Sequence, residues 1–309
     1  MRILVFGAGV LGCNIAADLF KAGMDVTLLA RGQWYETIRS QGLLIKGKFS
    51  FRTRTWPVPV IDHLAENDVY DVIFVSLRYT QLESVVELLG NNLSNTIIFN
   101  GNNPTASEFA AMFPHKRVLF SFAEVGGNRD GERVNSFNLH KMTIGGLTES
   151  DEDRLLIEKV FSGTKIRLVY EPNMNDYLLS HAAFVVPICF ACYHADGYLK
   201  RIMNDKAYIH RIIDANIECY TALEKLGHII LPAADQAYRT QRWRRLTFLF
   251  YRLMASCSLG KLVASDHALS AVDEMAALSA AMEKILRQAC TSSAAFDELK
   301  QDMRKYLKK

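Results

Sequence analysis

The feature that most constrains this chain is a glycine pattern that directly follows its first apolar segment. Residues 2–6 predict a buried strand, residues 7–12 read G-x-G-x-x-G, and the apolar residues that follow have helical spacing. A second strand is predicted over residues 25–30. A glycine pattern between a first strand and a helix is typical of the βαβ unit that binds a dinucleotide.

Each glycine has a separate role in such a unit. Gly7 allows the tight turn after the strand, Gly9 lets the backbone approach a pyrophosphate, and Gly12 lets the helix pack closely on the strand. The helix N-terminus adds free N–H groups and the positive end of a dipole. A purely structural glycine-rich turn is the alternative. The residues predicted to hold the pyrophosphate are Gly7, Ala8, Gly9, Val10, Leu11 and Gly12.

The residue after the second strand indicates which dinucleotide is bound. Enzymes that bind NAD usually carry an acidic residue there, on the ribose 2′-hydroxyl. This chain instead has Arg31, followed by Gly32 and Gln33. A guanidinium is always charged and binds phosphate through two donors. The sequence thus favours NADP over NAD, with a solvated surface arginine as the alternative.

Two further strand ends carry polar side chains. Residues 71–77 and 96–99 are nearly continuous apolar runs, typical of parallel strands buried on both faces. Arg78 follows the first run and Asn100 follows the second. Because ligands bind at the carboxyl ends of strands in open α/β sheets, both residues are predicted to contact cofactor or substrate. For Asn100, a turn former before Gly101 is a strong alternative.

Composition limits the class of protein. With 309 residues the chain is long enough for about two domains, and half of its residues are apolar, as in ordinary globular proteins. A net charge of +3 is too small to point to nucleic acid or to an anionic membrane. No apolar run approaches the roughly 20 residues that span a bilayer, and the first residues do not resemble a signal peptide. We expect a cytoplasmic protein with neither a nucleic-acid nor a membrane partner.

The six cysteines fit a reducing compartment, because they are scattered through a chain too long to need disulfides. Cys189 and Cys192 form a C-x-x-C, but no second pair follows. Two small buried hydrophobic residues are therefore the favoured interpretation over a redox or zinc site. No metal site is predicted.

The pattern changes near residue 170. Before it, strands are also expected at 117–122, 142–144 and 165–169, with a helix over 151–162. After it, only helices are expected: one from about 175 that Pro187 interrupts, then 205–226, 233–255, 265–289 and 292–308. The predicted fold is an N-terminal Rossmann-type α/β domain over residues 1–170, with a doubly wound parallel sheet, and an all-α domain over residues 171–309.

Five segments in the first 150 residues resemble the ketopantoate reductase (2-dehydropantoate 2-reductase) family, in its order and with similar spacing. They are residues 7–12, 29–32, 75–78 with Gln81, 100–101, and the glycine-rich stretch 126–131. The resemblance implies a Rossmann domain joined to a helical domain, with the active site in the cleft between them. It also implies that Arg31 meets the 2′-phosphate of NADP and that Asn100 lies near the nicotinamide. The family often has lysine where this chain has Arg78.

The second half departs from the family at its catalytic positions. The family's lysine, a general acid, aligns with Ser180, and its two asparagines align with Phe184 and Ile188. His181 is the most plausible replacement acid, because an unperturbed imidazole can hold or donate a proton near neutral pH. Tyr177 and Ser180 are expected to share its helix face.

A second pair of candidates lies further along the chain. His267, beside Asp266, could orient and polarise a carbonyl, and the family's late acidic residue could correspond to Asp266, Asp273 or Glu274. For each histidine, a hydrogen-bonded structural role is at least as common. The predicted catalytic residues are His181, Ser180, His267 and Asp266.

Two classes of function remain open. The first is an NADP-dependent reductase of a small 2-oxo acid, or a dehydrogenase of the matching 2-hydroxy acid, whose carboxylate substrate is not ketopantoate because apolar side chains replace the polar groups that would bind it. The alternative is a catalytically inactive NADP(H)-binding sensor or scaffold, and a third interpretation is an amino-acid or opine-type dehydrogenase. Arg239–Arg245 is a basic cluster that would attract an anionic substrate or form a solvated helix face. A homodimer stays open.

Overall fold

The computed structural model describes residues 1–309 except 49, 51, 258–259, 261–263 and 308–309, and the backbone alone of His267. The chain divides into two compact units, Met1–Met174 (unit 1) and Asn175–Lys309 (unit 2). The division lies close to residue 170, where the sequence pattern changes from strands to helices.

Unit 1 is built on one sheet with the order β4-β3-β9-β8-β7-β6-β1-β2-β5, and β10 pairs with β9. The pairs β1–β2, β1–β6, β6–β7 and β7–β8 are parallel, as in a Rossmann-type sheet. This confirms the predicted α/β class. The strands are β1 Arg2–Phe6, β2 Asp25–Leu29, β3 Leu43–Gly47, β4 Thr53–Trp56, β5 Val60–Ile61, β6 Val72–Val75, β7 Thr96–Asn100, β8 Arg117–Asp130, β9 Arg133–Gly145 and β10 Arg167–Tyr170.

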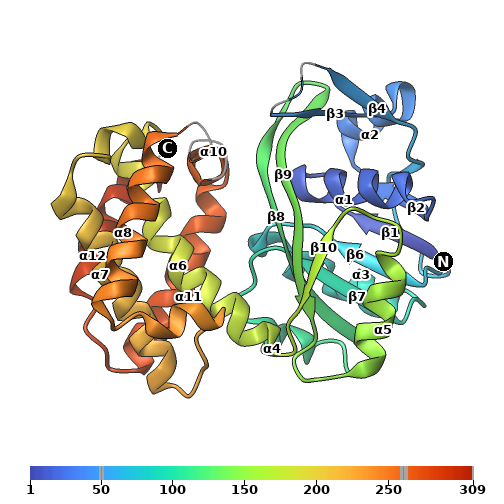
Figure 1. Ribbon diagram of the computed structural model, residues 1–309. Helices are drawn as coiled ribbons and strands as arrows, with labels where there is room; N and C mark the ends of the chain where they lie inside the picture. Colours follow the sequence, from blue (N-terminus) through green and yellow to red (C-terminus); the bar gives the residue numbers. More distant parts are fainter. Residues whose placement is uncertain (49, 51, 258–259, 261–263, 308–309) are drawn as a thin grey trace. The chain divides into compact units, whose positions relative to one another are not determined.

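The sheet is mixed rather than purely parallel, which corrects one part of the prediction. β8 and β9 are far longer than the short strands expected at 117–122 and 142–144, and they pair in antiparallel orientation. Gly127 makes this possible, because its φ is +155° and a Cβ there would lie 2.1 Å from the carbonyl oxygen of Asn135 on the opposite strand. The two strands rise together alongside α1 (Val10–Lys21) towards β3 and β4 (Figure 1).

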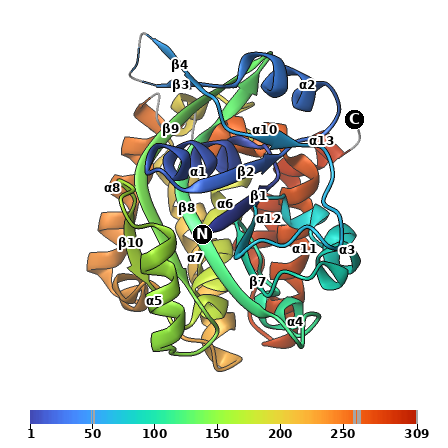
Figure 2. The same ribbon diagram turned by 90° about the vertical axis from the view of Figure 1, so that its right-hand side faces the viewer.

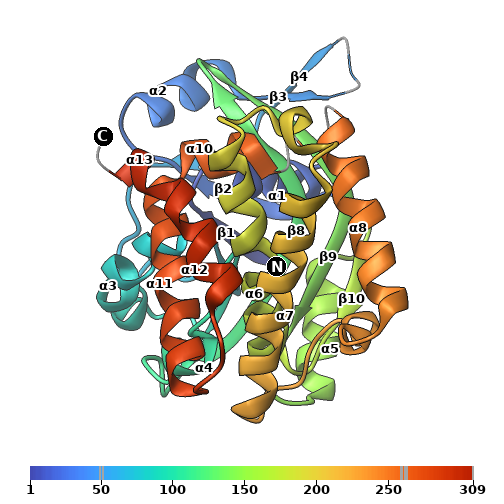
Figure 3. The same cartoon turned by 90° about the vertical axis from the view of Figure 1, so that its left-hand side faces the viewer.

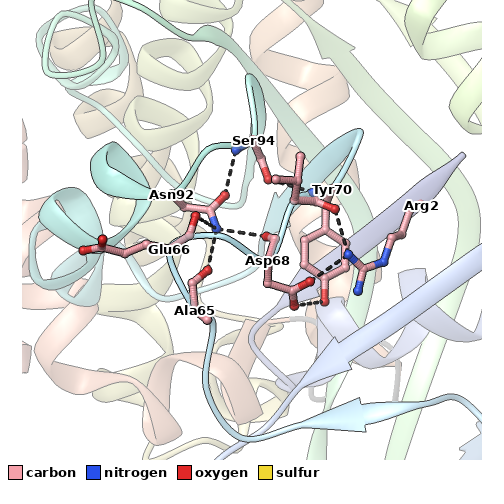
Figure 4. Close-up of polar contacts among 8 residues, drawn as sticks. Arg2, Ala65, Glu66, Asp68, Tyr70, Asn92 and Ser94 are labelled. Atoms are coloured by element: carbon pink, nitrogen blue, oxygen red, sulfur yellow. Dashed lines mark hydrogen bonds and ion pairs between the residues drawn. The ribbon is translucent and has the colours of Figure 1, made fainter.

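A polar network holds the amino ends of the central strands (Figure 4). Arg2, at the start of β1, forms an ion pair with Asp68 at 2.7 Å, and Asp68 also accepts a hydrogen bond from the Tyr70 hydroxyl. The amide of Asn92 donates to the Asp68 carbonyl, and its oxygen accepts from the backbone N–H of Ser94. These contacts lie at the edge of the sheet opposite the strand ends that carry the glycine pattern.

The helices of unit 1 pack on this sheet over a core of buried aliphatic side chains from β1, β2, β6 and α1 (Figure 2). Ser150 caps α5 (Asp151–Val160) by accepting a hydrogen bond from the N–H of Asp153, and acidic residues fill the first turn of this helix. The helices are α1 Val10–Lys21, α2 Gly32–Gln41, η1 Tyr79–Gln81, η2 Glu83–Val85, α3 Val86–Asn91, α4 Ala106–Ala110 and α5 Asp151–Val160.

Unit 2 is all-helical, as predicted, and α7 packs against α8, α11 and α12 (Figure 3). The predicted helix over 265–289 is two helices, and the one over 292–308 is three short ones. Within the described residues, the helices of unit 2 are α6 Met174–His194, η3 Leu199–Ile202, α7 Lys206–Lys225, η4 Ala233–Ala237, α8 Gln241–Ser256, α10 Asp266–Ser270, α11 Val272–Gln288, α12 Ala294–Lys300, η6 Gln301–Met303 and α13 Arg304–Leu307.

Pro187 lies inside α6, and the helix continues through it. Because proline has no N–H, the carbonyl of Ala183 loses its helical donor. Asn216 on α7 replaces that donor: its Nδ2 donates to the carbonyl oxygens of Ala183 and Phe184, each at 3.0 Å. Its Oδ1 accepts a 2.6 Å hydrogen bond from the Tyr251 hydroxyl on α8. Three helices are thus joined at a fully buried amide.

Helix α6 also carries the C-x-x-C. Cys189 and Cys192 are buried, and burial raises the pKa of both thiols, so the thiolate that metal or redox chemistry needs is disfavoured. Among the described residues, no group of three His, Cys, Asp or Glu side chains could hold a metal ion. Helix α6 is long and apolar enough to cross a membrane by length and composition, but 67% of its apolar window is buried inside the structure, which makes this weak evidence for a span.

Candidate functional site: the glycine loop and the carboxyl edge of the sheet

The three glycines of residues 7–12 are surrounded in three different ways. Gly7 has a φ of +114°, and a Cβ there would lie 2.5 Å from the carbonyl oxygen of Ser76. A Cβ on Gly12 would lie 2.0 Å from the carbonyl oxygen of Gly7. A Cβ on Gly9 would meet nothing within 4 Å. Gly7 and Gly12 are therefore needed for the fold of the loop, whereas the space beside Gly9 is open.

Helix α1 starts directly after this open space. Its N-cap is Gly9, which has no side chain to cap the helix, and its first turn contains no acidic residue. The N–H groups of Val10, Leu11 and Gly12 have no partner within an α-helix, and the helix dipole adds positive potential. The residues present therefore fit the pyrophosphate of a dinucleotide, for which the loop provides donors and room.

Asn100 lies at the same edge of the sheet, at the end of β7, and is 3% exposed. Its Nδ2 donates to the Ser76 hydroxyl oxygen at 3.2 Å, and its Oδ1 accepts from the Ser121 hydroxyl at 3.1 Å. The side chain thus bridges Ser76, directly after β6, and Ser121, within β8, on its two sides. This amide is held in one orientation by two serines, which the simple view of Asn100 as a turn former does not require.

Arg31 lies exposed at the other side of the loop, where β2 has ended and α2 is about to begin. Its guanidinium lies 5.8 Å from the centre of the Phe6 ring, and among the described residues no carboxylate lies within ion-pair distance of it. Three residues later, the Trp34 indole N–H donates a 2.9 Å hydrogen bond to the carbonyl oxygen of Ala8. The start of α2 is thereby tied to the glycine loop.

Arg78 is also exposed, at the end of β6. It precedes the short helix η1, and its backbone N–H donates to the side-chain oxygen of Gln81 at 3.2 Å. The structure therefore brings the loop of residues 7–12, Arg78 and Asn100 to the carboxyl edge of one sheet, with Arg31 at the end of β2.

In unit 2, the predicted catalytic residues of α6 lie on two different sides of the helix. His181 is half-buried, and its ring stacks with that of Tyr177 at 6.5 Å, as the spacing predicts. Ser180 is 1% exposed, and its hydroxyl oxygen accepts a hydrogen bond from the N–H of Leu231 at 3.0 Å. Ser180 therefore does not share the face of His181 and Tyr177; it faces the loop after α7.

Asp176 lies one turn before Ser180 on that same side. Its carboxylate accepts hydrogen bonds from His228 at 2.7 Å and from the N–H of Ile229 at 2.9 Å. Burial raises the pKa of Asp176, but the hydrogen bonds from His228 and Ile229 outweigh it, so the pKa is lowered overall. Asp176 and Ser180 together anchor the loop of residues 228–231.

The second predicted pair, Asp266 and His267, lies only partly within the described residues. Asp266 is half-buried at the start of α10, whereas the side chain of His267 lies outside the described part of the chain. The two other carboxylates, Asp273 and Glu274, lie on α11. Asp273 is exposed, whereas Glu274 is buried near Cys189.

The basic cluster Arg239–Arg245 is partly neutralised. Arg239 pairs with Glu224 and Arg244 pairs with Asp214, both at 2.7 Å. Trp243 is buried and donates its indole N–H to Asp235. Two of the four arginines are therefore bound to carboxylates, which supports the view of this segment as a helix face.

Three residues of the site were missed by the sequence reasoning: Trp34, Ser76 and Ser121. Ser76 lies in a segment that resembles the family, and its position directly after a buried strand is a signal for a site residue. Trp34 and Ser121 carry no such signal, since their contacts with Ala8 and Asn100 join positions that are 26 and 21 residues apart in the chain.

Comparison with known proteins agrees with this geometry. The family model of ketopantoate reductase PanE/ApbA matches residues 3–149. An uncharacterized oxidoreductase of Bacillus subtilis, YkpB, is 26% identical over 266 residues, which are 83% of this chain and 84% of that protein.

Solved structures of the same fold cover nearly the whole chain. A 2-dehydropantoate 2-reductase from Geobacter metallireducens superposes with a TM-score of 0.78 at 16% identity, over 99% of this chain and all of the other. A D-mandelate dehydrogenase, solved with NADH and anilino(oxo)acetate, gives 0.74 at 12% identity, over 99% and 97%. Residues 3–149, which contain the glycine loop and the strand ends described above, therefore match the family model of ketopantoate reductase PanE/ApbA.

Proposed function

We propose that this protein is an NADP-dependent oxidoreductase that reduces a small 2-oxo acid with an apolar side chain, or oxidises the matching 2-hydroxy acid. The observation that carries the proposal is the open space beside Gly9 at the uncapped start of α1, with the exposed Arg31 at the neighbouring strand end. The family match of residues 3–149 and the oxidoreductase YkpB support the reaction class.

The choice of NADP rests on Arg31. An acidic residue is missing from the position that usually binds the ribose 2′-hydroxyl. A guanidinium without a carboxylate partner among the described residues is available to a phosphate dianion. The nicotinamide of the bound cofactor supplies or accepts the hydride.

Reduction of a carbonyl also consumes one proton, which must reach the carbonyl oxygen. His181 is our candidate donor, since an imidazole holds a proton near neutral pH and its ring is oriented by stacking on Tyr177. Ser180 is the weaker candidate, because its hydroxyl is buried and bonded to the backbone of Leu231. Asp266 and His267 remain candidates for orienting the substrate.

The preference for an apolar substrate rests on the residues that follow His181 on α6. Phe184 and Ile188 are half-buried, and the ring of Phe184 packs against those of Phe250 and Tyr251 on α8, at 6.1 and 5.7 Å. Such a surface offers no hydrogen bond to a hydroxylated substrate such as ketopantoate, so the unpaired hydroxyl would disfavour binding. One solved structure of the same fold is a D-mandelate dehydrogenase with anilino(oxo)acetate. Mandelate and anilino(oxo)acetate each carry an aromatic ring.

The test is consumption of NADPH and NADH with 2-oxo acids of graded side chain: pyruvate, ketopantoate and phenylglyoxylate. We expect phenylglyoxylate to have the highest kcat/KM with NADPH. Phe184→Asn should reduce that advantage over ketopantoate about tenfold or more. Tight NADPH binding without turnover of any 2-oxo acid would instead support the sensor or scaffold.

Two variants separate cofactor binding from proton transfer. Arg31→Ala should weaken NADPH at least about tenfold while leaving NADH nearly unchanged, and equal losses would overturn the NADP assignment. His181→Ala should lower kcat by roughly 10²-fold or more without changing the Kd of NADPH. Unchanged turnover in His181→Ala would refute its role as the acid.

A further inference from the structure

A second exposed arginine lies beside the glycine loop, and the proposed function does not use it. Arg129 lies on β8, almost 100 residues after Arg31 in the chain. Its guanidinium lies 5.2 Å from the centre of the Trp34 ring, and among the described residues it has no carboxylate within ion-pair distance. Arg31 and Arg129 thus share three properties: each is exposed, lies over an aromatic ring and has no carboxylate partner in the described part of the chain.

Trp34 connects the two arginines. It is the third residue of α2, so it lies within one helical turn of Arg31, which precedes the helix. Its indole N–H is bonded to the carbonyl oxygen of Ala8 in the glycine loop. The face of Trp34 therefore holds the guanidinium of Arg129 close to the start of α2 and to the loop.

The long β8–β9 pair is what brings Arg129 to this place. The close approach of the strands at Gly127 carries β8 beyond the parallel part of the sheet, past its partner residues on β7. The pair also packs on α1, where the Ser136 hydroxyl donates to Asn14 Oδ1 at 3.0 Å.

The charge of Arg129 also reaches the first turns of α1. Burial raises the pKa of the Cys13 thiol to about 12, while Trp34 and the positive charge of Arg129 act in the opposite direction. The positive charge of Arg129 therefore adds to the positive potential that the helix dipole produces in the first turns of α1.

We propose that Arg129 is a second phosphate-binding residue of the dinucleotide site, which binds the 2′-phosphate of NADP together with Arg31 while stacked on Trp34. The inference rests on the proposed function, because only NADP carries this phosphate. A 2′-phosphate bears close to two negative charges, which one arginine neutralises only in part. Two guanidiniums together neutralise both negative charges of the phosphate. Because each is already oriented by an aromatic ring, little side-chain entropy is lost on binding.

The test compares the Kd values of NADPH and NADH, by titration calorimetry, for the wild type and Arg129→Gln. We expect the Kd of NADPH to rise about tenfold and that of NADH to change less than twofold. The dependence of the NADPH Kd on salt should become shallower, because one phosphate contact is lost. Arg129→Lys should fall between the wild type and Arg129→Gln, since it keeps the charge but loses the planar stack.

Arg133→Gln is the matched control. Arg133 lies on the same hairpin but is paired with Asp130 at 3.2 Å, so its loss should leave both Kd values unchanged. A Tm close to that of the wild type for each variant shows that the hairpin is intact, and Arg129→Lys provides the test if Arg129→Gln fails to fold.

Each outcome separates this inference from the proposed function. If Arg31→Gln weakens NADPH selectively and Arg129→Gln does not, the role of Arg129 is refuted and the cofactor assignment stands. Equal losses of NADPH and NADH in Arg129→Gln would mean that the residue only supports Trp34, and would also refute it. A wild type that prefers NADH would overturn both.

Discussion

At the scale of single residues, the glycines of the loop differ in what a methyl group would meet. Gly12 has the carbonyl of Gly7 at 2.0 Å from its would-be Cβ, whereas Gly9 has open space and a backbone conformation, φ −78°, that alanine adopts freely. One position is closed by the protein's own backbone, and the other is left open where a pyrophosphate would approach. We therefore expect substitutions of Gly12 to affect folding and substitutions of Gly9 to affect cofactor binding.

Gly9→Ala should leave the free energy of unfolding within about 0.5 kcal/mol of the wild type, because nothing in the protein contacts the new methyl group. It should raise the Kd of NADPH at least about tenfold, because the methyl group occupies the approach of the phosphates. Gly12→Ala should instead cost at least about 2 kcal/mol of stability through overpacking. Urea unfolding and calorimetric titration of both variants measure these effects. Unchanged NADPH binding in Gly9→Ala would contradict the placement of the cofactor.

At the scale of elements, α6 combines an internal proline with faces that have different tasks. Asn216 on α7 supplies the hydrogen bond that Pro187 cannot give to the Ala183 carbonyl of α6, and it also donates to the carbonyl of Phe184. Asp176 and Ser180 anchor the loop after α7, and this leaves Tyr177 and His181 together on another face. The polar contacts of Asp176 and Ser180 thus hold the helix in place without using the side chains of Tyr177 and His181.

Asn216→Ala should destabilise the protein by about 3 kcal/mol, because it leaves the buried Ala183 carbonyl and the Tyr251 hydroxyl without their hydrogen-bond partner. Pro187→Ala restores an N–H for the Ala183 carbonyl, so the double variant should lose less than the sum of the single effects. Urea unfolding of the four proteins in the cycle gives the coupling energy. Strict additivity would show that the Asn216 amide does not compensate for the proline.

At the scale of the whole molecule, the chain divides into two compact units, and unit 2 contains a carboxylate whose contacts depend on pH. In unit 2, the carboxylate of Asp176 holds the loop of residues 228–231, and its pKa is lowered in the folded state. Such a group contributes stability above its unfolded pKa of about 3.9, and this contribution is lost as the pH falls through the lower folded pKa. Acid should therefore weaken unit 2 through this residue.

Asp176→Asn should cost unit 2 about 1–3 kcal/mol at pH 7, and the difference from the wild type should shrink towards pH 3. Hydrogen exchange of the α7 backbone amides, measured from pH 7 to pH 3, reports on this unit. The control is Asp196→Asn: the pKa of Asp196 is also lowered, to about 2, mainly by Lys305, but its ion pair is exposed, so the effect should be small. A constant difference between Asp176→Asn and the wild type at all pH values would contradict the role of this carboxylate.

Much of unit 1 was predictable because its signals are local. The apolar runs around the glycine pattern, the stop at Gly23 and the polar residues after the buried strands are features of neighbouring residues, and β1, α1, β2, β6 and β7 follow from them. The extent of β8 and β9 was missed, since it depends on a close approach at Gly127 that only the opposite strand reveals. β3 and β4 were missed as well; they are short strands at one end of the sheet order, and the sequence reasoning placed nothing there.

The sequence alone was enough to indicate the Rossmann-type unit, the helical unit, the family and the positions of Arg31 and Asn100, because each depends on residue type and spacing along the chain. Only the folded structure showed that two serines hold Asn100, that Ser180 faces a loop rather than the side of His181, and that Arg129 reaches Trp34. The physical reason is the same in each case. A periodic pattern in the sequence predicts which face of a helix or strand a side chain occupies. The residue that contacts this side chain comes from a distant segment, and the position of that segment depends on the packing of the whole unit.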